Sequence, residues 1–325
     1  MGGFLKQLRR RLGAGLLTLC ALPPPLATAD SLISPALAPQ PVILWYRNYD
    51  SPAVHALLTL ALEKTPEYGP YQIVRSIEMG QGRALHELMR NSSDVITVAN
   101  VAATLDREDD LVAIPIPIDS GLLGLRVCLV TPANRDLFEG VDSVAEFRQR
   151  GLRVGQGVHW PDTGILQANG VEVITHPQFE ILFRMLINDR FECFARGVSE
   201  VLYDLEQQHP DEFVIEPHLL IAYPFPSYFF VSRADHETGQ RIQLGMERAI
   251  EDGSFSAFLD DFYARPVREL GLDQRQVLTL ENPFLSEESA KVVSRALQFL
   301  QAFIERHGES ATPLNGVLEQ PAVKP

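Results

Sequence analysis

The chain has 325 residues, of which 46% are hydrophobic and 22% are charged, and its formal net charge is −14. An acidic surface of this kind repels nucleic acid and anionic lipid, so neither is an expected partner. A chain of this length can bury two hydrophobic cores, which predicts two lobes.

Residues 1–29 have the three parts of a secretory signal peptide. A basic start (residues 6–11) precedes an apolar run (residues 12–22), and the small-residue motif Ala27-Thr28-Ala29 follows. We therefore predict cleavage after this motif and a periplasmic protein. A lipid anchor at Cys20 and a retained N-terminal anchor are the alternatives. No later stretch approaches the 18 uninterrupted apolar residues of a membrane span, so we expect a soluble product.

Strands and helices then alternate, which predicts β-α-β units and a parallel sheet. Ser51 is the expected N-cap of the first helix, and Pro52 is its first residue. The strands are PVILWYRNYD, which ends in turn residues, YQIVRSI and DVITVANVA, and the helices are SPAVHALLTLALEK and GQGRALHELMRNSS.

The prolines of LVAIPIPIDSGLLGLRVCLVTP exclude a helix and predict an extended segment. A second series of alternating helices and strands follows up to residue 207, and then a second extended segment, EPHLLIAYPFPSYFFVS. The rest is predicted to be helical up to residue 308, apart from one loop.

Two α/β series joined by two extended crossings predict an α/β fold with two lobes, each built on a mixed, mostly parallel sheet. Ligands in such folds bind beyond the carboxyl ends of the strands, so a cleft is expected between the lobes. We assign 1–29 to the signal peptide, 30–120 and 220–308 to the first lobe with an extra helix at 286–307, 121–219 to the second lobe, and 309–325 to a disordered tail.

Two cysteines lie after the signal peptide, Cys128 in LRVCLV and Cys193 in FECFARG. Their spacing does not fit a zinc site. A disulfide in an oxidising compartment and two buried thiols are both open.

The loop VGQGVHWPDTGIL lacks the Lys-Ser/Thr of a phosphate-binding loop and the third glycine of a dinucleotide fingerprint. The chain also lacks the G-x-S-x-G and H-E-x-x-H motifs, and neither cysteine is placed as an activated nucleophile. We therefore expect no enzyme activity, no cofactor and no metal. The loop follows a second-lobe strand and precedes a helix, which favours a wall of the cleft.

The order of elements from Pro41 to Tyr263 resembles the family 3 extracellular solute-binding proteins, which have the type II periplasmic binding fold and include amino-acid receptors of ABC transporters. The stretches that carry this resemblance are SVAEFRQRGLRVGQG, AIEDGSFSAFLDDFY and SSDVITVANVAATLDRE. It implies a monomer that binds a small solute, with a membrane permease as its partner.

The resemblance also implies the binding residues. Arg107 falls on the arginine that binds a ligand carboxylate, and Arg196 stands where amino-acid receptors present an acidic residue to the ammonium group. The other implied cleft positions are Tyr49, Gln81, Asn100, His159, Trp160 and Thr163.

Arg83 is a further candidate from the sequence itself, because it lies at a helix start where a cation is unfavourable. Each of the three arginines has a surface alternative. Arg107 and Arg196 have acidic neighbours in sequence with which to pair, and Arg83 would simply be exposed.

We therefore expect a periplasmic protein that captures a small anionic or amino-acid-like solute and presents it to an ABC-type permease. The alternative is a sensory subunit of the same fold that regulates a membrane signalling protein. The extra helix motivates this alternative, because Leu297, Leu300 and Phe303 would either dock a partner or pack back on the first lobe.

Overall fold

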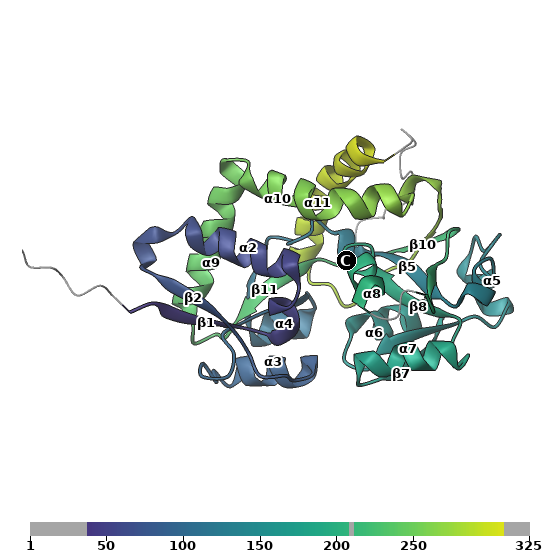
Figure 1. Cartoon of the computed structure of the whole chain (residues 1–325), viewed down its shortest axis with the longest axis horizontal. Helices are drawn as coiled ribbons and strands as arrows, with labels where there is room; N and C mark the ends of the chain where they lie inside the picture. The colour runs from purple at the N-terminus through teal and green to yellow at the C-terminus, as the bar shows by residue number, and fades with distance from the viewer. Residues whose placement is uncertain (1–37, 208–210, 309–325) are drawn as a thin grey trace, which may run out of the picture. The chain divides into compact units, whose positions relative to one another are not determined.

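In a computed structural model of the protein, residues 38–207 and 211–308 are described. The predicted signal peptide at 1–29 and the predicted tail at 309–325 lie outside the described residues. The described ranges contain two mixed sheets covered by helices, so the predicted α/β fold class is confirmed (Figure 1).

The first sheet has five strands in the order β2-β1-β3-β11-β4. β1 is parallel to β2 and β3, whereas β11 is antiparallel to β3 and β4. The strands are β1 (Gln40–Leu44), β2 (Tyr71–Arg75), β3 (Val98–Ala102), β4 (Val112–Ile114) and β11 (Ser227–Val231).

Helices cover both faces of the first sheet. Alternate residues of each strand point to opposite sides, so each face packs against its own set of helices. Val98 and Phe229 share a core with residues of α2 and α9, whereas Val101 and Phe230 share a second core with residues of α3 (Figure 1). We call this sheet and its helices the first lobe. The helices are α1 (Tyr46–Tyr49), α2 (Pro52–Glu63), α3 (Gln81–Met89), α4 (Leu105–Asp110), α9 (His236–Glu251), α10 (Ser254–Glu269) and α11 (Glu287–His307).

The second sheet has seven strands in the order β12-β10-β5-β8-β6-β7, with β9 also paired to β5. We call this sheet and its helices the second lobe. The strands are β5 (Leu125–Val130), β6 (Arg153–Gly157), β7 (Glu172–His176), β8 (Cys193–Gly197), β9 (Val214–Ile215), β10 (Leu219–Ala222) and β12 (Gln276–Thr279). The helices are α5 (Val144–Gln149), α6 (Pro161–Ala168), α7 (Phe179–Ile187) and α8 (Val201–Gln207).

A disulfide joins Cys128 of β5 to Cys193 of β8. These strands are antiparallel neighbours in the second sheet. Of the two alternatives that the sequence left open, the structure therefore has the bonded pair. The bond closes a loop of 65 residues within the second lobe.

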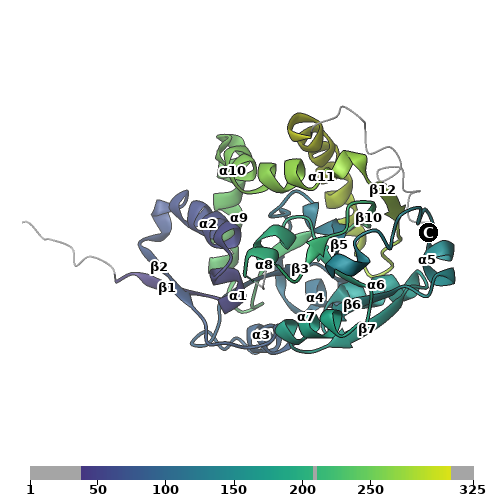
Figure 2. The same cartoon turned by 45° about the vertical axis from the view of Figure 1, so that its right-hand side comes forward.

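The chain crosses between the lobes more often than the sequence predicted. The two expected crossings lie between β4 and β5 and between β10 and β11. After α10 the chain returns to the second sheet as β12, which pairs in parallel with β10 (Figure 2), and then leaves it again for α11. The sequence predicts that residues 220–308 belong to the first lobe, but β12 and residues 220–222 of β10 lie in the second sheet.

The C-terminal helix α11 packs on the rest of the protein. Its N-cap, Ser286, donates a hydrogen bond to the Glu108 carboxylate of α4 at 2.6 Å. Leu300 is 3% exposed and Phe303 is 2% exposed. These two side chains are therefore part of the core and do not form an open docking face. Within the described ranges, no helix is long and apolar enough to cross a membrane.

Candidate functional site

A cleft of about 370 Å³ lies between the two lobes. The first lobe contributes the start of α1, the end of β3 and α4. The second lobe contributes β5, the start of α6, the end of β8 and α8. The crossing segments form part of its wall through Asp119 and Phe225.

Arg107 is a buried cation of the first-lobe wall, with 7% of its surface exposed. It lies on α4, which begins after the N-cap Thr104. Its Nη1 donates to Ala102 O at 2.7 Å, and its Nη2 donates to Gln81 Oε1 at 2.9 Å and to His159 O at 3.2 Å.

No carboxylate of the described residues lies within 4.0 Å of the Arg107 guanidinium. Burial lowers the pKa of Arg107 to about 10, and the charge of Asp162 offsets only part of this effect. The Arg107 Nε makes no hydrogen bond to any described residue. Arg107 therefore has capacity for an anion at the cleft.

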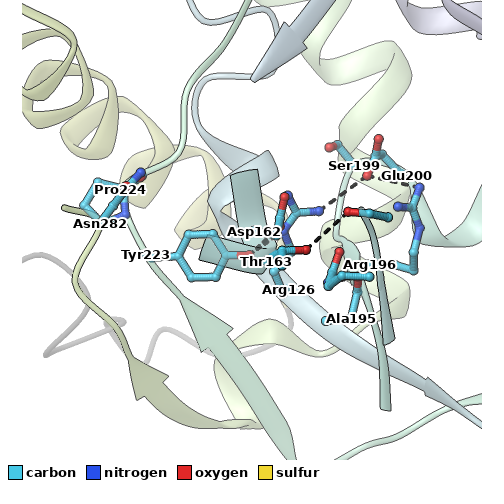
Figure 3. Close-up of polar contacts among 12 residues, drawn as sticks. Arg126, Asp162, Thr163, Ala195, Arg196, Ser199, Glu200, Tyr223, Pro224 and Asn282 are labelled. Atoms are coloured by element: carbon cyan, nitrogen blue, oxygen red, sulfur yellow. Dashed lines mark hydrogen bonds and ion pairs between the residues drawn. The ribbon is translucent and has the colours of Figure 1, made fainter. Parts of the chain in front are cut away.

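Arg126 and Arg196 lie on the second-lobe wall of the cleft, and each has a close carboxylate partner. Arg126 on β5 contacts Asp162 of α6 at 2.8 Å (Figure 3). Arg196 on β8 contacts Asp204 of α8 at 2.7 Å. The Arg196 guanidinium also lies 5.0 Å from the ring centroid of Trp160. All four charged groups are buried, so each pair compensates its own charges.

Glu200 lies just before α8 and bridges both arginines. Its Oε2 lies 3.5 Å from Arg126 Nη1 and 3.3 Å from Arg196 Nη2. Burial alone would raise the pKa of the Glu200 carboxyl, but the charges of Arg196, Arg126 and Arg47 outweigh burial and lower it. Glu200 is therefore ionised at neutral pH.

Asp119 lies in the first crossing segment, and burial raises its pKa to about 6. Its Oδ2 accepts a hydrogen bond from Ser199 Oγ at 2.9 Å, and its Oδ1 accepts one from Gly121 N at 3.1 Å. The nearby charge of Glu200 also raises this pKa. The side of the cleft that the first crossing segment forms thus carries a carboxyl group that is protonated in mild acid.

Direct contacts tie the two lobes together at the cleft. Besides the bond from Arg107 to His159 O, Tyr203 of α8 donates to Asp50 O at 2.9 Å. Arg47 of α1 lies 4.1 Å from the ring centroid of Phe179 on α7. A change in the orientation of the lobes would therefore alter these contacts on both walls of the cleft.

The structure brings five of the nine predicted site residues together. The residues that line the cleft are Gln81, Asn100, Arg107, Trp160 and Arg196. Their contact with a ligand stays a prediction. Arg196 lies in the predicted place, but it pairs with Asp204 and Glu200, as in the alternative that the sequence left open.

The other four predicted residues do not line the cleft. Tyr49 packs edge-on against His55, with ring centroids 4.9 Å apart. Arg83 is 59% exposed and lies 3.7 Å from Glu87 on the same helix, so the surface alternative holds.

His159 contacts residues of the first lobe, and Thr163 bonds within its own segment at the start of α6. The His159 ring lies against Gly82, where an added Cβ would be 3.3 Å from it, and only the His159 carbonyl reaches Arg107. Thr163 Oγ1 donates to Gly157 O at 3.2 Å.

Sequence reasoning missed several charged residues of the cleft. Arg126 carried a usable signal, because an arginine inside the apolar strand LRVCLV must be paired or functional when the strand is buried. Its partner Asp162 had no such signal, since it is 36 positions away from Arg126. The missed residues are Asp119, Arg126, Asp162 and Asp204, whereas Glu200 is one of the sequence neighbours expected to pair with Arg196.

In the described part of the chain, no group of three or more His, Cys, Asp and Glu side chains is arranged to hold a metal ion. No protein-family model matches the sequence, and no curated protein matches it.

Solved structures resemble this one in fold. An amino acid ABC transporter substrate-binding protein from Streptococcus pneumoniae, bound to L-arginine, is 12% identical; the match covers 70% of this chain and 95% of that chain, with a TM-score of 0.52. An ancestral arginine-binding protein bound to arginine is 14% identical over 69% of this chain and 98% of that chain, with a TM-score of 0.50.

A third structure with the same fold is the GluR0 ligand-binding core from Nostoc punctiforme in complex with L-glutamate. It is 12% identical, and the match covers 69% of this chain and 99% of that chain, with a TM-score of 0.50. All three of these structures hold a bound amino acid. The two sheets, their crossings and these matches together show that the chain has the type II periplasmic binding fold.

Proposed function

We propose that this protein is a periplasmic solute-binding protein that holds a small solute with an anionic group between its lobes and presents it to an ABC-type permease. The observation that carries the proposal is Arg107, a buried cation at the cleft with no carboxylate partner among the described residues.

Keeping this guanidinium charged inside the protein costs free energy, which is why its pKa is lowered. An anionic group of a solute would offset that cost through charge-assisted hydrogen bonds, each contributing about 1.5–3 kcal/mol before desolvation. The fixed bonds to Ala102 O and Gln81 Oε1 orient the guanidinium in advance. Little side-chain entropy would then be lost on binding.

The periplasmic location rests on the predicted signal peptide and on the disulfide, which persists in an oxidising compartment. The permease partner rests on the shared fold with a substrate-binding protein of an amino acid ABC transporter. The sensory alternative is not favoured, because α11 buries Leu300 and Phe303 instead of offering them to a partner.

The test is the thermal stability of residues 30–325, titrated with amino acids, monocarboxylates and dicarboxylates after unfolding and refolding to remove any carried ligand. A solute at a hundred times its dissociation constant should stabilise the protein by about 2.7 kcal/mol. A saturable shift with one class of anion is expected. No shift with any member of the panel would contradict the proposed function.

A further inference from the structure

The two buried arginines of the second-lobe wall share one loosely held carboxylate. Arg126 and Arg196 each have a close partner at 2.8 and 2.7 Å, whereas Glu200 lies between them at 3.5 and 3.3 Å. Figure 3 shows Glu200 beside both arginines, with Asp162 on the Arg126 side. Glu200 is therefore an additional anion in a place where two guanidinium groups converge.

Glu200 is also the exposed member of this group. Its side chain is 40% exposed, whereas those of Arg126 and Arg196 are 4% and 6% exposed. It directly precedes Val201, the first residue of α8. The carboxylate can therefore leave the arginines for solvent without disturbing a buried side chain.

The position that the Glu200 carboxylate occupies is electropositive. The charges of Arg196, Arg126 and Arg47 lower its pKa in spite of partial burial, although Asp204 stands close by. An anion from solution would meet the same attraction at the same place.

Gly197 leaves room beside this position. A Cβ on Gly197 would lie 3.0 Å from Glu200 Oε2 and 3.1 Å from Arg126 Nη1. The backbone at the end of β8 thus leaves space for a carboxylate against the two arginines.

We infer that Arg126 and Arg196 form a second anion subsite, which Glu200 fills from within the protein and which the second anionic group of a dicarboxylate solute fills in its place. This inference rests on the proposed function, in which Arg107 binds the first anionic group. A dicarboxylate would then span the cleft from the first-lobe wall to the second-lobe wall, and Glu200 would select against solutes that cannot displace it.

The experiment compares the affinities of succinate, glutarate and butyrate for the wild type and for Glu200→Gln by calorimetric titration. The variant removes the competing charge and keeps the size of the side chain. Asp162 and Asp204 still balance the two arginines, so the variant should fold. Succinate or glutarate should bind about tenfold or more tightly to it, whereas butyrate should change by less than about threefold.

Glu206→Gln is the matched control. Glu206 also lines the cleft on α8, but it pairs with Arg265 at 2.9 Å and contacts neither Arg126 nor Arg196. It should show no gain for the dicarboxylates. Glu200→Ala is a second variant that should show the same gain as Glu200→Gln.

Three outcomes would overturn the inference. Dicarboxylate affinity in both Glu200 variants that is unchanged or weaker would show that Glu200 does not compete with the solute. An equal gain in Glu206→Gln would show a general charge effect. If butyrate still binds to the wild type in either of these cases, the proposed function stands and only the second subsite is excluded. If no carboxylate binds to the wild type or to any variant, the proposed function and the second subsite are both excluded.

Discussion

Replacing Arg107 by methionine should strongly weaken solute binding while leaving the fold stable. Burial lowers the pKa of Arg107 from its ordinary value to about 10, which corresponds to about 3 kcal/mol of destabilisation by the charged form. Because the folded-state pKa of this base is lowered, the cost is fully present at neutral pH and disappears only as the pH rises above about 10. Methionine removes the cost and fills a similar volume.

The same substitution also removes three hydrogen bonds, to Ala102 O, Gln81 Oε1 and His159 O. Of these three acceptors only Ala102 O is in a fully buried bond, and leaving it without a donor costs about 1–3 kcal/mol. The two effects oppose each other, so the free energy of unfolding without solute should change by less than about 2 kcal/mol. Solute affinity should fall by about 2–4 kcal/mol, or roughly 30- to 1000-fold.

Urea unfolding followed by tryptophan fluorescence gives the stability, and calorimetric titration with the anion that stabilises the wild type gives the affinity. Unchanged affinity would exclude Arg107 from the binding site. A loss of stability well above 3 kcal/mol would show that Arg107 is a structural residue, and that its lack of a carboxylate partner has no connection with solute binding.

Two further predictions concern stability. The folded-state pKa of Asp119 is raised from 3.8 to about 6, first by burial, so the stability should fall by up to about 3 kcal/mol as the pH rises from 4 to 7. Asp119→Asn should flatten this part of the pH profile of unfolding free energy, and an unaltered profile would contradict the assignment. Replacing both Cys128 and Cys193 by alanine opens a loop of 65 residues and should lower the free energy of unfolding in urea by about 4 kcal/mol; no change would show that the bond contributes nothing.

The alternating series of strands and helices could be predicted because each element has a clear period of its own. The run SPAVHALLTLALEK became α2, with its predicted apolar residues buried. β12 could not be predicted, because QVLT is a short run whose pairing with β10 is decided by tertiary contacts. Four residues at a sheet edge have no periodicity that separates a strand from a loop.

The site was predicted only in part, for a related reason. Arg107 could be located because its stretch resembles a known motif, and the structure places it in the cleft. The charge state of the second-lobe wall depends on pairs that are distant in sequence, such as Arg126 with Asp162. His159 does not line the cleft, and its ring lies against Gly82 of the other lobe, a contact that sequence neighbours do not encode.

The position of β12 also has a consequence for the order in which the protein completes its fold. The last strand of the first sheet, β11, ends at Val231, whereas the second sheet lacks its edge strand until Gln276–Thr279 has been synthesised. Until then β10 has an unpaired edge, which is a template for aggregation. Of the two sheets, the second is therefore the last to be completed, and the second lobe cannot be excised as one continuous segment without exposing that edge.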